Sequence, residues 1–135
     1  MNKSIKLLLV VAIAVFTLNS CRDKGRMVEP RYDRAHVMLQ ETNHNFGVLT
    51  DAQNVEKFYL TLINDGGEDL QITEVYNHCH CTHVEYPKDP IKAGHGVKLE
   101  VFLNVDDLDY GLFTRTIDIH TNSGTATLFL QGEKR

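Results

Sequence analysis

The chain has 135 residues, of which 42% are hydrophobic and 24% charged, with no tryptophan and three cysteines. This length fits one ordinary domain with a short appendage and excludes two full domains or a large α/β barrel. The net charge of −4 argues against nucleic-acid binding, which uses clustered lysine and arginine. Three cysteines are too few for a small domain held together mainly by disulfides.

Residues 1–20 have the pattern of a secretory signal peptide. Lys3 and Lys6 precede ten uninterrupted apolar residues, 7–16, a run too short for a membrane-spanning helix of about 20 residues. A buried core helix is the structural alternative, but such a helix has one apolar stripe rather than an apolar surface all round. The sequence therefore predicts export. Cleavage after Ser20 would change the net charge from −4 to −6.

The end of this segment, Leu18-Asn19-Ser20-Cys21, resembles the lipobox of bacterial lipoproteins, although Asn19 departs from the usual small or apolar residue. The resemblance implies a lipid on Cys21, which would become the acylated N-terminus. Several acyl chains, each contributing about 0.8 kcal/mol per buried CH₂, tether a protein stably to a membrane. Ordinary cleavage that leaves Cys21 as a free thiol is the alternative. The strongly charged residues 21–34 are then typical of a flexible tether.

From residue 35 to residue 135 the apolar residues alternate with a period of two, which is typical of half-buried β-strands. Residues 97–105 show this alternation most regularly, and further strands are expected over residues 36–40, 57–64, 70–76, 113–121 and 125–131. Asp65-Gly66-Gly67 and Asn122-Ser123-Gly124 are expected to be turns, the first of the hairpin type. About seven short strands without a convincing helix predict an immunoglobulin-like antiparallel β-sandwich over residues 35–135. An open barrel is the alternative.

Eight short motifs follow one another in the order found in a known family. They are Asn45-Phe46-Gly47-Val48, Phe58 with Leu62-Ile63-Asn64-Asp65-Gly66, Leu70-Gln71-Ile72, Cys79-His80-Cys81-Thr82, Ile91-Lys92-Ala93-Gly94-His95, Gly111-Leu112-Phe113, Thr121-Asn122, and Leu128-Phe129-Leu130-Gln131-Gly132. Together they resemble the bacterial domain-of-unknown-function family 1573, small Ig-like exported proteins that are often lipoproteins of Gram-negative bacteria. His80 and Ala93 stand where this family usually has glycine and proline. The resemblance implies the fold and export, and it implies no biochemical activity.

Five potential metal ligands crowd into residues 78–83: His78, Cys79, His80, Cys81 and His83. Thiolate and imidazole groups suit zinc or copper. The backbone must bend for them to share one ion, because side chains at i and i+2 of a straight strand lie about 6.5–7 Å apart. The cysteines also fit two other interpretations, small buried side chains at a turn or a Cys79–Cys81 disulfide that is easily reduced and redox-active. No further motif supports nucleophilic catalysis.

We therefore expect a lipid-anchored binding module in the cell envelope of a Gram-negative bacterium, on the periplasmic side or at the cell surface, without enzymatic activity. Its partners would be the membrane, through the lipid on Cys21, and an envelope protein or glycan that contacts a sheet edge or loops. A zinc- or copper-binding protein, or a thiol-redox protein, centred on residues 78–83 is the alternative function.

Overall fold

The computed structural model describes residues 25–135, so the predicted signal peptide, the lipid site at Cys21 and the first part of the tether lie outside the described residues. This part of the chain forms eight strands and no helix. The strands are β1 (Val37–Leu39), β2 (Asn43–Leu49), β3 (Val55–Asn64), β4 (Ile72–Asn77), β5 (Thr82–Glu85), β6 (Gly96–Asn104), β7 (Gly111–Thr121) and β8 (Gly124–Lys134). Within residues 25–135, no helix with the length and hydropathy of a membrane span is present.

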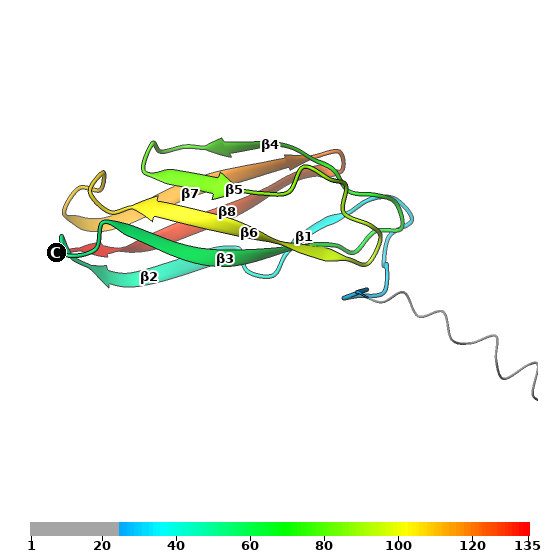
Figure 1. Cartoon of the computed structure of the whole chain (residues 1–135), viewed down its shortest axis with the longest axis horizontal. Coiled ribbons are helices and arrows are strands. Elements are labelled where there is room, and N and C mark those ends of the chain that lie inside the picture. The colour runs from blue at the N-terminus through cyan, green and yellow to red at the C-terminus, as the bar shows by residue number, and fades with distance from the viewer. Residues whose placement is uncertain (1–24) are drawn as a thin grey trace, which may run out of the picture.

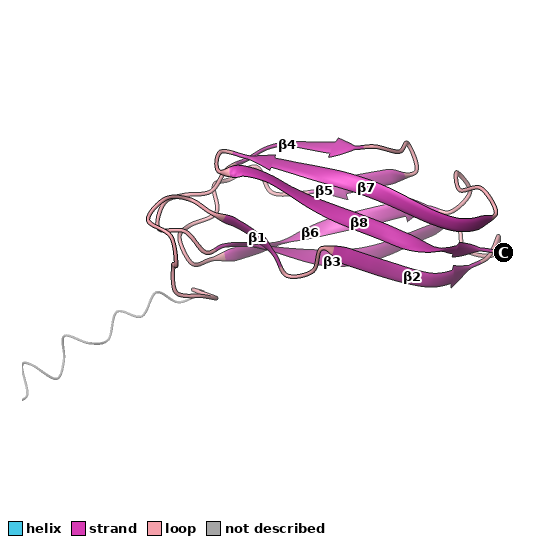
Figure 2. Cartoon of the chain, turned by 180° about the vertical axis from the view of Figure 1, so that it is seen from behind, coloured by secondary structure: helices cyan, strands magenta, loops and turns pink. Residues whose placement is uncertain are grey.

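The strands form two four-stranded sheets that face each other, in the orders β1-β3-β6-β5 and β2-β8-β7-β4 (Figure 1, Figure 2). The first sheet and the β8-β7-β4 part of the second correspond to the A-B-E-D and G-F-C sheets of a constant-type immunoglobulin domain. The predicted Ig-like sandwich is therefore confirmed, with eight strands in place of about seven.

One strand pair departs from the predicted antiparallel arrangement, because β2 runs parallel to β8, with His44 opposite Leu130. β1 pairs antiparallel with β3 in the other sheet. β1 and β2 are successive parts of one segment, which leaves the first sheet after Leu39 and joins the second at Asn43. Since the chain keeps its direction across this change of sheet (Figure 1), β2 lies parallel to its new neighbour.

The core lies between the sheets and consists of the alternating apolar residues of the central strands. In β6, Leu99, Val101 and Leu103 are completely buried while Lys98 is exposed, as the alternation predicted. The other fully buried large side chains are Leu49, Leu60, Leu62, Leu70, Val105, Ile117, Ile119, Leu128 and Leu130. Full burial of a side chain of this size contributes about 1.5–3 kcal/mol, so apolar packing between the sheets is the main source of stability.

The predicted hairpin at Asp65-Gly66-Gly67 is wrong, because the chain passes here from β3 in one sheet to β4 in the other. The N-terminal segment runs directly against this turn, and Tyr32 pairs with Gly66 in an isolated parallel bridge. A Cβ atom at Gly66 would lie 2.0 Å from the backbone oxygen of Arg34. Glycine is therefore needed for close backbone packing rather than for a hairpin. The second predicted turn, Asn122-Ser123-Gly124, does connect the paired strands β7 and β8.

Residues 27–36 extend the fold at the end where the chain enters (Figure 1). The backbone N–H groups of Met27 and Val28 donate to the oxygen of Gly94 at 2.7 and 3.0 Å, and the N–H of Arg31 donates to the oxygen of Asp65 at 2.7 Å. From Met27 onward, the segment predicted as a flexible tether is thus held against the domain. Main-chain hydrogen bonds make this possible, since they do not require apolar side chains, of which this charged segment has few.

Candidate functional site

The end of the sandwich opposite the N-terminal segment, here called the distal end, gathers the loops at residues 50–54, 78–81 and 105–110 and the C-terminus (Figure 1). Main-chain hydrogen bonds connect these loops: the N–H of Asn104 donates to the oxygen of Cys81 at 2.7 Å, and the N–H of Val105 donates to that of Asn54 at 2.9 Å. Loops held on a rigid scaffold in this way commonly carry binding residues.

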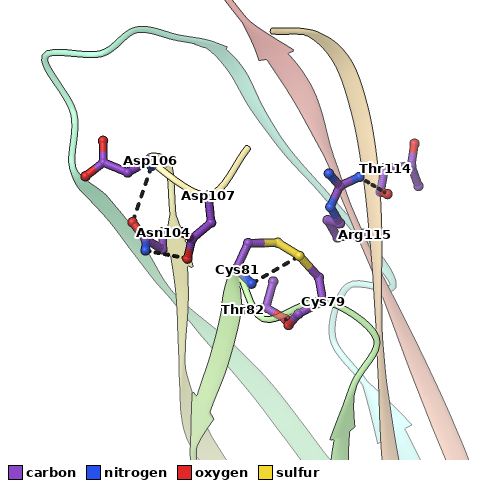
Figure 3. The surroundings of a disulfide bond; sticks show 8 residues. All are labelled: Cys79, Cys81, Thr82, Asn104, Asp106, Asp107, Thr114 and Arg115. Carbon is purple, nitrogen blue, oxygen red and sulfur yellow. Dashed lines mark hydrogen bonds between the residues drawn. A yellow bond between two sulfur atoms is a disulfide. The ribbon is translucent and has the colours of Figure 1, made fainter. Parts of the chain in front are cut away.

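Cys79 and Cys81 form a disulfide in the loop between β4 and β5, with an S–S distance of 2.00 Å (Figure 3). The backbone N–H of Cys81 donates to Sγ of Cys79 at 3.1 Å. The N–H and the hydroxyl of Thr82 both donate to the backbone oxygen of Cys79, at 3.3 and 3.1 Å. These hydrogen bonds close the loop into a tight turn. The sequence left the state of the two cysteines open, and the structure shows them bonded to each other.

The two cysteines differ in burial. Cys81 is 1% exposed and belongs to an apolar cluster with Leu103 and Phe113, whereas Cys79 is half-buried at the margin of that cluster. The surface beside the disulfide is hollowed into a depression of about 660 Å³, which is lined by His78, Cys79, His80, Cys81, Asp107, Thr114, Arg115 and Thr116. The disulfide is therefore approached from solvent on its Cys79 side.

The three histidines of the predicted metal site have separate surroundings. Nε2 of His78 lies 2.7 Å from Oδ2 of Asp118, the ring of His83 lies beside that of Phe102 with centroids 6.0 Å apart, and His80 is exposed. The disulfide occupies both sulfur atoms. Within residues 25–135, no three His, Cys, Asp or Glu side chains form a group that could hold a metal ion. The geometry thus gives the predicted zinc or copper site no support.

The partner of His78 is Asp118, to which no motif in the sequence points. The hydroxyl of Thr127 donates to Oδ1 of Asp118 at 2.6 Å, and this hydrogen bond together with His78 holds the pKa of the Asp118 carboxyl below its ordinary value. Asp118 and Thr127 lie directly opposite each other in the β7–β8 hairpin. The turn predicted at residues 122–124 could have indicated this pairing, because it connects β7 to β8 and sets their register.

A buried lysine, also not singled out from the sequence, fastens two distal loops. Lys134 is 5% exposed, and its Nζ donates to the oxygen of Leu108 at 3.1 Å and lies 3.3 Å from Oδ1 of Asp51. The hydroxyl of Tyr110 donates to Oδ2 of Asp51, and this bond, with Lys134, holds the pKa of the Asp51 carboxyl below its ordinary value. The sequence pattern could have indicated that Lys134 is buried, because this residue continues the alternating inward-facing positions of β8.

A second depression, about 430 Å³ in volume, lies at the distal end between β2 and β7. We call it the β2–β7 groove, and it is lined by Asn45, Gly47, Val48, Leu112, Phe113, Thr114, Gln131, Gly132 and Glu133. Two apolar side chains on its border are strongly exposed, Leu112 at 87% and Val48 at 50%. Gly47 has a φ of +72°, and the register of β2 shifts between Asn45 and Val48. This bulge places Val48 beside the groove.

Two facing sheets in the strand order of an immunoglobulin domain, with the first strand divided between them, define this protein as an Ig-like or PapD-like β-sandwich. A protein of unknown function from Porphyromonas gingivalis W83 shares the fold at 17% identity and a TM-score of 0.66, over 75% of this chain and 47% of that one. The ASH/PapD-like domain 7 of human CEP192 does so at 11% identity and a TM-score of 0.61, over 81% and 90%. The YadV chaperone is similar at 11% identity and a TM-score of 0.56, over 73% and 51%.

The family model described as Protein of unknown function (DUF1573) matches residues 37–133, and this chain belongs to that family. The resemblance drawn from the eight sequence motifs is thereby confirmed. A comparison with curated proteins gives no match. This chain spans about half the length of the Porphyromonas gingivalis protein to which it is similar. At these identities the similarity to solved structures shows the fold alone.

Proposed function

We propose that this chain is a lipid-anchored binding module of the cell envelope that contacts a protein partner through its distal end. A lipid on Cys21 would place the anchor shortly before Met27, where the chain is hydrogen-bonded to the domain. The end of the sandwich that the N-terminal segment enters would then face the membrane. The distal end would face away from the membrane (Figure 1), where other envelope components can reach it.

The β2–β7 groove is the observation that carries this proposal. Leu112 and Val48 border it with 87% and 50% of their surfaces exposed. A partner that fully buried a leucine of this kind would gain about 1.5–3 kcal/mol. Polar side chains, among them Asn45 and Gln131, lie around the same groove. Exposed apolar side chains beside polar groups that can form hydrogen bonds are a usual combination in a protein interface.

The chemistry of the groove favours a protein over a glycan. Leu112 and Val48 offer no hydrogen bonds, and covering them with sugar hydroxyls would leave those hydroxyls without partners, at a cost in free energy. A polypeptide has a further means of binding here. β2 is the edge strand of its sheet, so an extended segment of the partner can add main-chain hydrogen bonds beside its apolar contacts.

Site-specific photo-cross-linking in living cells tests this function. A photoreactive amino acid replaces Leu112 in the membrane-anchored chain, and the matched control carries it at Ser123, an exposed position at the opposite end. We expect a discrete cross-linked product from position 112, its loss when Val48→Glu is added, and no such product from position 123. No product from position 112, or identical products from both positions, would contradict the proposal.

A further inference from the structure

The distal end carries a second reactive feature besides the β2–β7 groove, namely the Cys79–Cys81 disulfide. We infer that this disulfide undergoes thiol–disulfide exchange with the dithiol of a partner protein. Cys79 supplies the sulfur that the incoming thiolate attacks, and Cys81 supplies the sulfur that leaves. This activity goes beyond the proposed binding function and does not depend on the groove.

Access is one of the factors that decide which sulfur of a disulfide reacts, together with the pKa of the thiol that leaves. Cys81 is 1% exposed and lies among apolar side chains, including Leu103 and Phe113. Both cysteines line the open depression, but Cys79 is only half-buried and is the more exposed of the two. An incoming thiolate therefore reaches Cys79 first. This asymmetry between an accessible and a buried sulfur gives the exchange a fixed direction.

The surroundings of Cys79 favour a sulfur anion. Arg115 of β7 lines the same depression (Figure 3), and a cation beside a disulfide attracts a thiolate and stabilises it. Asp107 also lines the depression, and its carboxylate keeps its charge while Oδ2 accepts a hydrogen bond from the side-chain amide of Asn104 at 2.6 Å. The main stabilisation of a thiolate therefore comes from a backbone group. The backbone N–H of Cys81 points to Sγ of Cys79 at 3.1 Å. The same N–H is placed to stabilise Cys79 as a thiolate when the disulfide opens.

The exchange has two balanced steps. In the first, a partner thiolate attacks Sγ of Cys79, the S–S bond to Cys81 breaks, and Cys81 leaves with the electron pair and takes up a proton. In the second, the other partner thiolate attacks the partner's sulfur in the mixed disulfide, and Cys79 leaves as a thiolate. Two electrons pass from the partner dithiol, which becomes a disulfide, to the Cys79–Cys81 pair, which becomes a dithiol.

The contacts that hold the loop do not require the disulfide, so they are available in the disulfide and in the dithiol form. The strands on either side of it are held by their own ladders, with Asn77 of β4 opposite Ile117 and Thr82 of β5 opposite Leu103. The hydrogen bond from the N–H of Asn104 to the oxygen of Cys81 joins backbone atoms and does not involve either sulfur. Opening the disulfide therefore leaves the distal end folded, as repeated exchange requires.

The first test uses the full chain, extracted from membranes in detergent, with reduced glutathione as the probe. We expect glutathione to open the disulfide at neutral pH without denaturant. Mass mapping of the acid-quenched mixed disulfide should find glutathione on Cys79 about ten-fold more often than on Cys81. A disulfide that opens only in denaturant, or an adduct found mainly on Cys81, would overturn the inference.

The second test compares two matched variants expressed in the bacterial envelope. Cys81→Ala leaves the accessible sulfur alone, and Cys79→Ala leaves the buried one. We expect Cys81→Ala to accumulate reductant-sensitive adducts with other proteins, about ten-fold more than Cys79→Ala, above a background set by the double alanine variant. No adducts with Cys81→Ala, or equal amounts with both, would overturn the exchange with a protein dithiol. If Cys81→Ala does not fold, glutathione mapping on the unsubstituted chain still decides the order of attack.

Discussion

Nδ1 of His36 lies 2.6 Å from Oδ1 of Asp65, and this contact fastens the segment that enters the domain to the turn that follows β3. Asp65 is 3% exposed, and the ring of Tyr32 stacks on that of His36 with centroids 3.9 Å apart. Oδ1 of Asn64 accepts hydrogen bonds from the N–H groups of His36 and Gly66, at 3.3 and 3.0 Å. These polar contacts hold the N-terminal segment, to which a membrane anchor would be attached, in a fixed place on the sandwich.

The His36–Asp65 contact should contribute measurably to stability. Asp65→Asn is expected to lower the free energy of unfolding by about 1–2 kcal/mol, and His36→Ala by about 1 kcal/mol, because the histidine is only half-buried. In a double-mutant cycle measured by urea unfolding, the coupling energy should be about 1 kcal/mol. A coupling of zero would show that the two side chains are adjacent without stabilising each other.

Two glycines should respond differently to alanine. Gly66→Ala is expected to cost more than about 3 kcal/mol, because its Cβ would lie 2.0 Å from the backbone oxygen of Arg34. Gly47→Ala is the control, since Gly47 has a φ of +72° and a Cβ atom added there would meet nothing within 4 Å. Its expected cost is about 1–2 kcal/mol from backbone strain alone. Equal losses in thermal unfolding would contradict the close packing at Gly66.

Regular alternation made the long strands predictable, and its absence explains the strands that were missed. In β2 the inward-facing His44 is polar and stacks on Phe58 with ring centroids 3.8 Å apart, and the bulge at Gly47 breaks the period of two. β5 has four residues and follows the disulfide loop directly, so it is too short for an alternation of apolar and polar residues to be recognised. The turn at Gly66 was misread because the sequence does not reveal which backbone approaches a glycine.

For the candidate site, the sequence predicted only which residue types gather in one loop, and not which side chains contact one another. Cysteine and histidine in residues 78–83 marked the loop, but the partner of His78 is Asp118, which is 40 residues away in the sequence. Val48 and Leu112 come together only because β2 and β7 flank β8 on opposite sides. Both relationships depend on strand order and register, which local patterns do not specify.

Stability at low pH should depend on Thr127. Its hydroxyl lowers the pKa of the Asp118 carboxyl, so the folded state gains stability that is complete above the ordinary pKa of about 3.9 and is lost as the pH falls through the lower, folded-state pKa. Thr127→Val should raise the pKa of Asp118, as measured by NMR titration. It should cost about 1 kcal/mol at neutral pH and less once the pH has fallen through the folded-state pKa of Asp118. The control is Thr114→Val, which lies on the same face of β7 as Asp118. An equal cost at both pH values would contradict this role of Thr127.

Reduction of the Cys79–Cys81 disulfide should cost little stability. The bond closes a loop with a sequence separation of 2, and so short a loop restricts the unfolded chain by only about 1–2 kcal/mol. Urea unfolding with and without reductant measures the difference, and the Cys79→Ala/Cys81→Ala variant should match the reduced protein. A loss above about 4 kcal/mol, or unfolding on reduction, would mean that the bond holds the distal end together.

The lipid anchor on Cys21, on which the proposed function depends, is tested most directly by the intact mass of the chain extracted from bacterial membranes. We expect a polypeptide that begins at Cys21 and carries the mass of three acyl chains, which would set the domain on the membrane with its distal end outward. A chain that begins downstream of Cys21, or an unmodified Cys21 at the N-terminus, would contradict the anchored module.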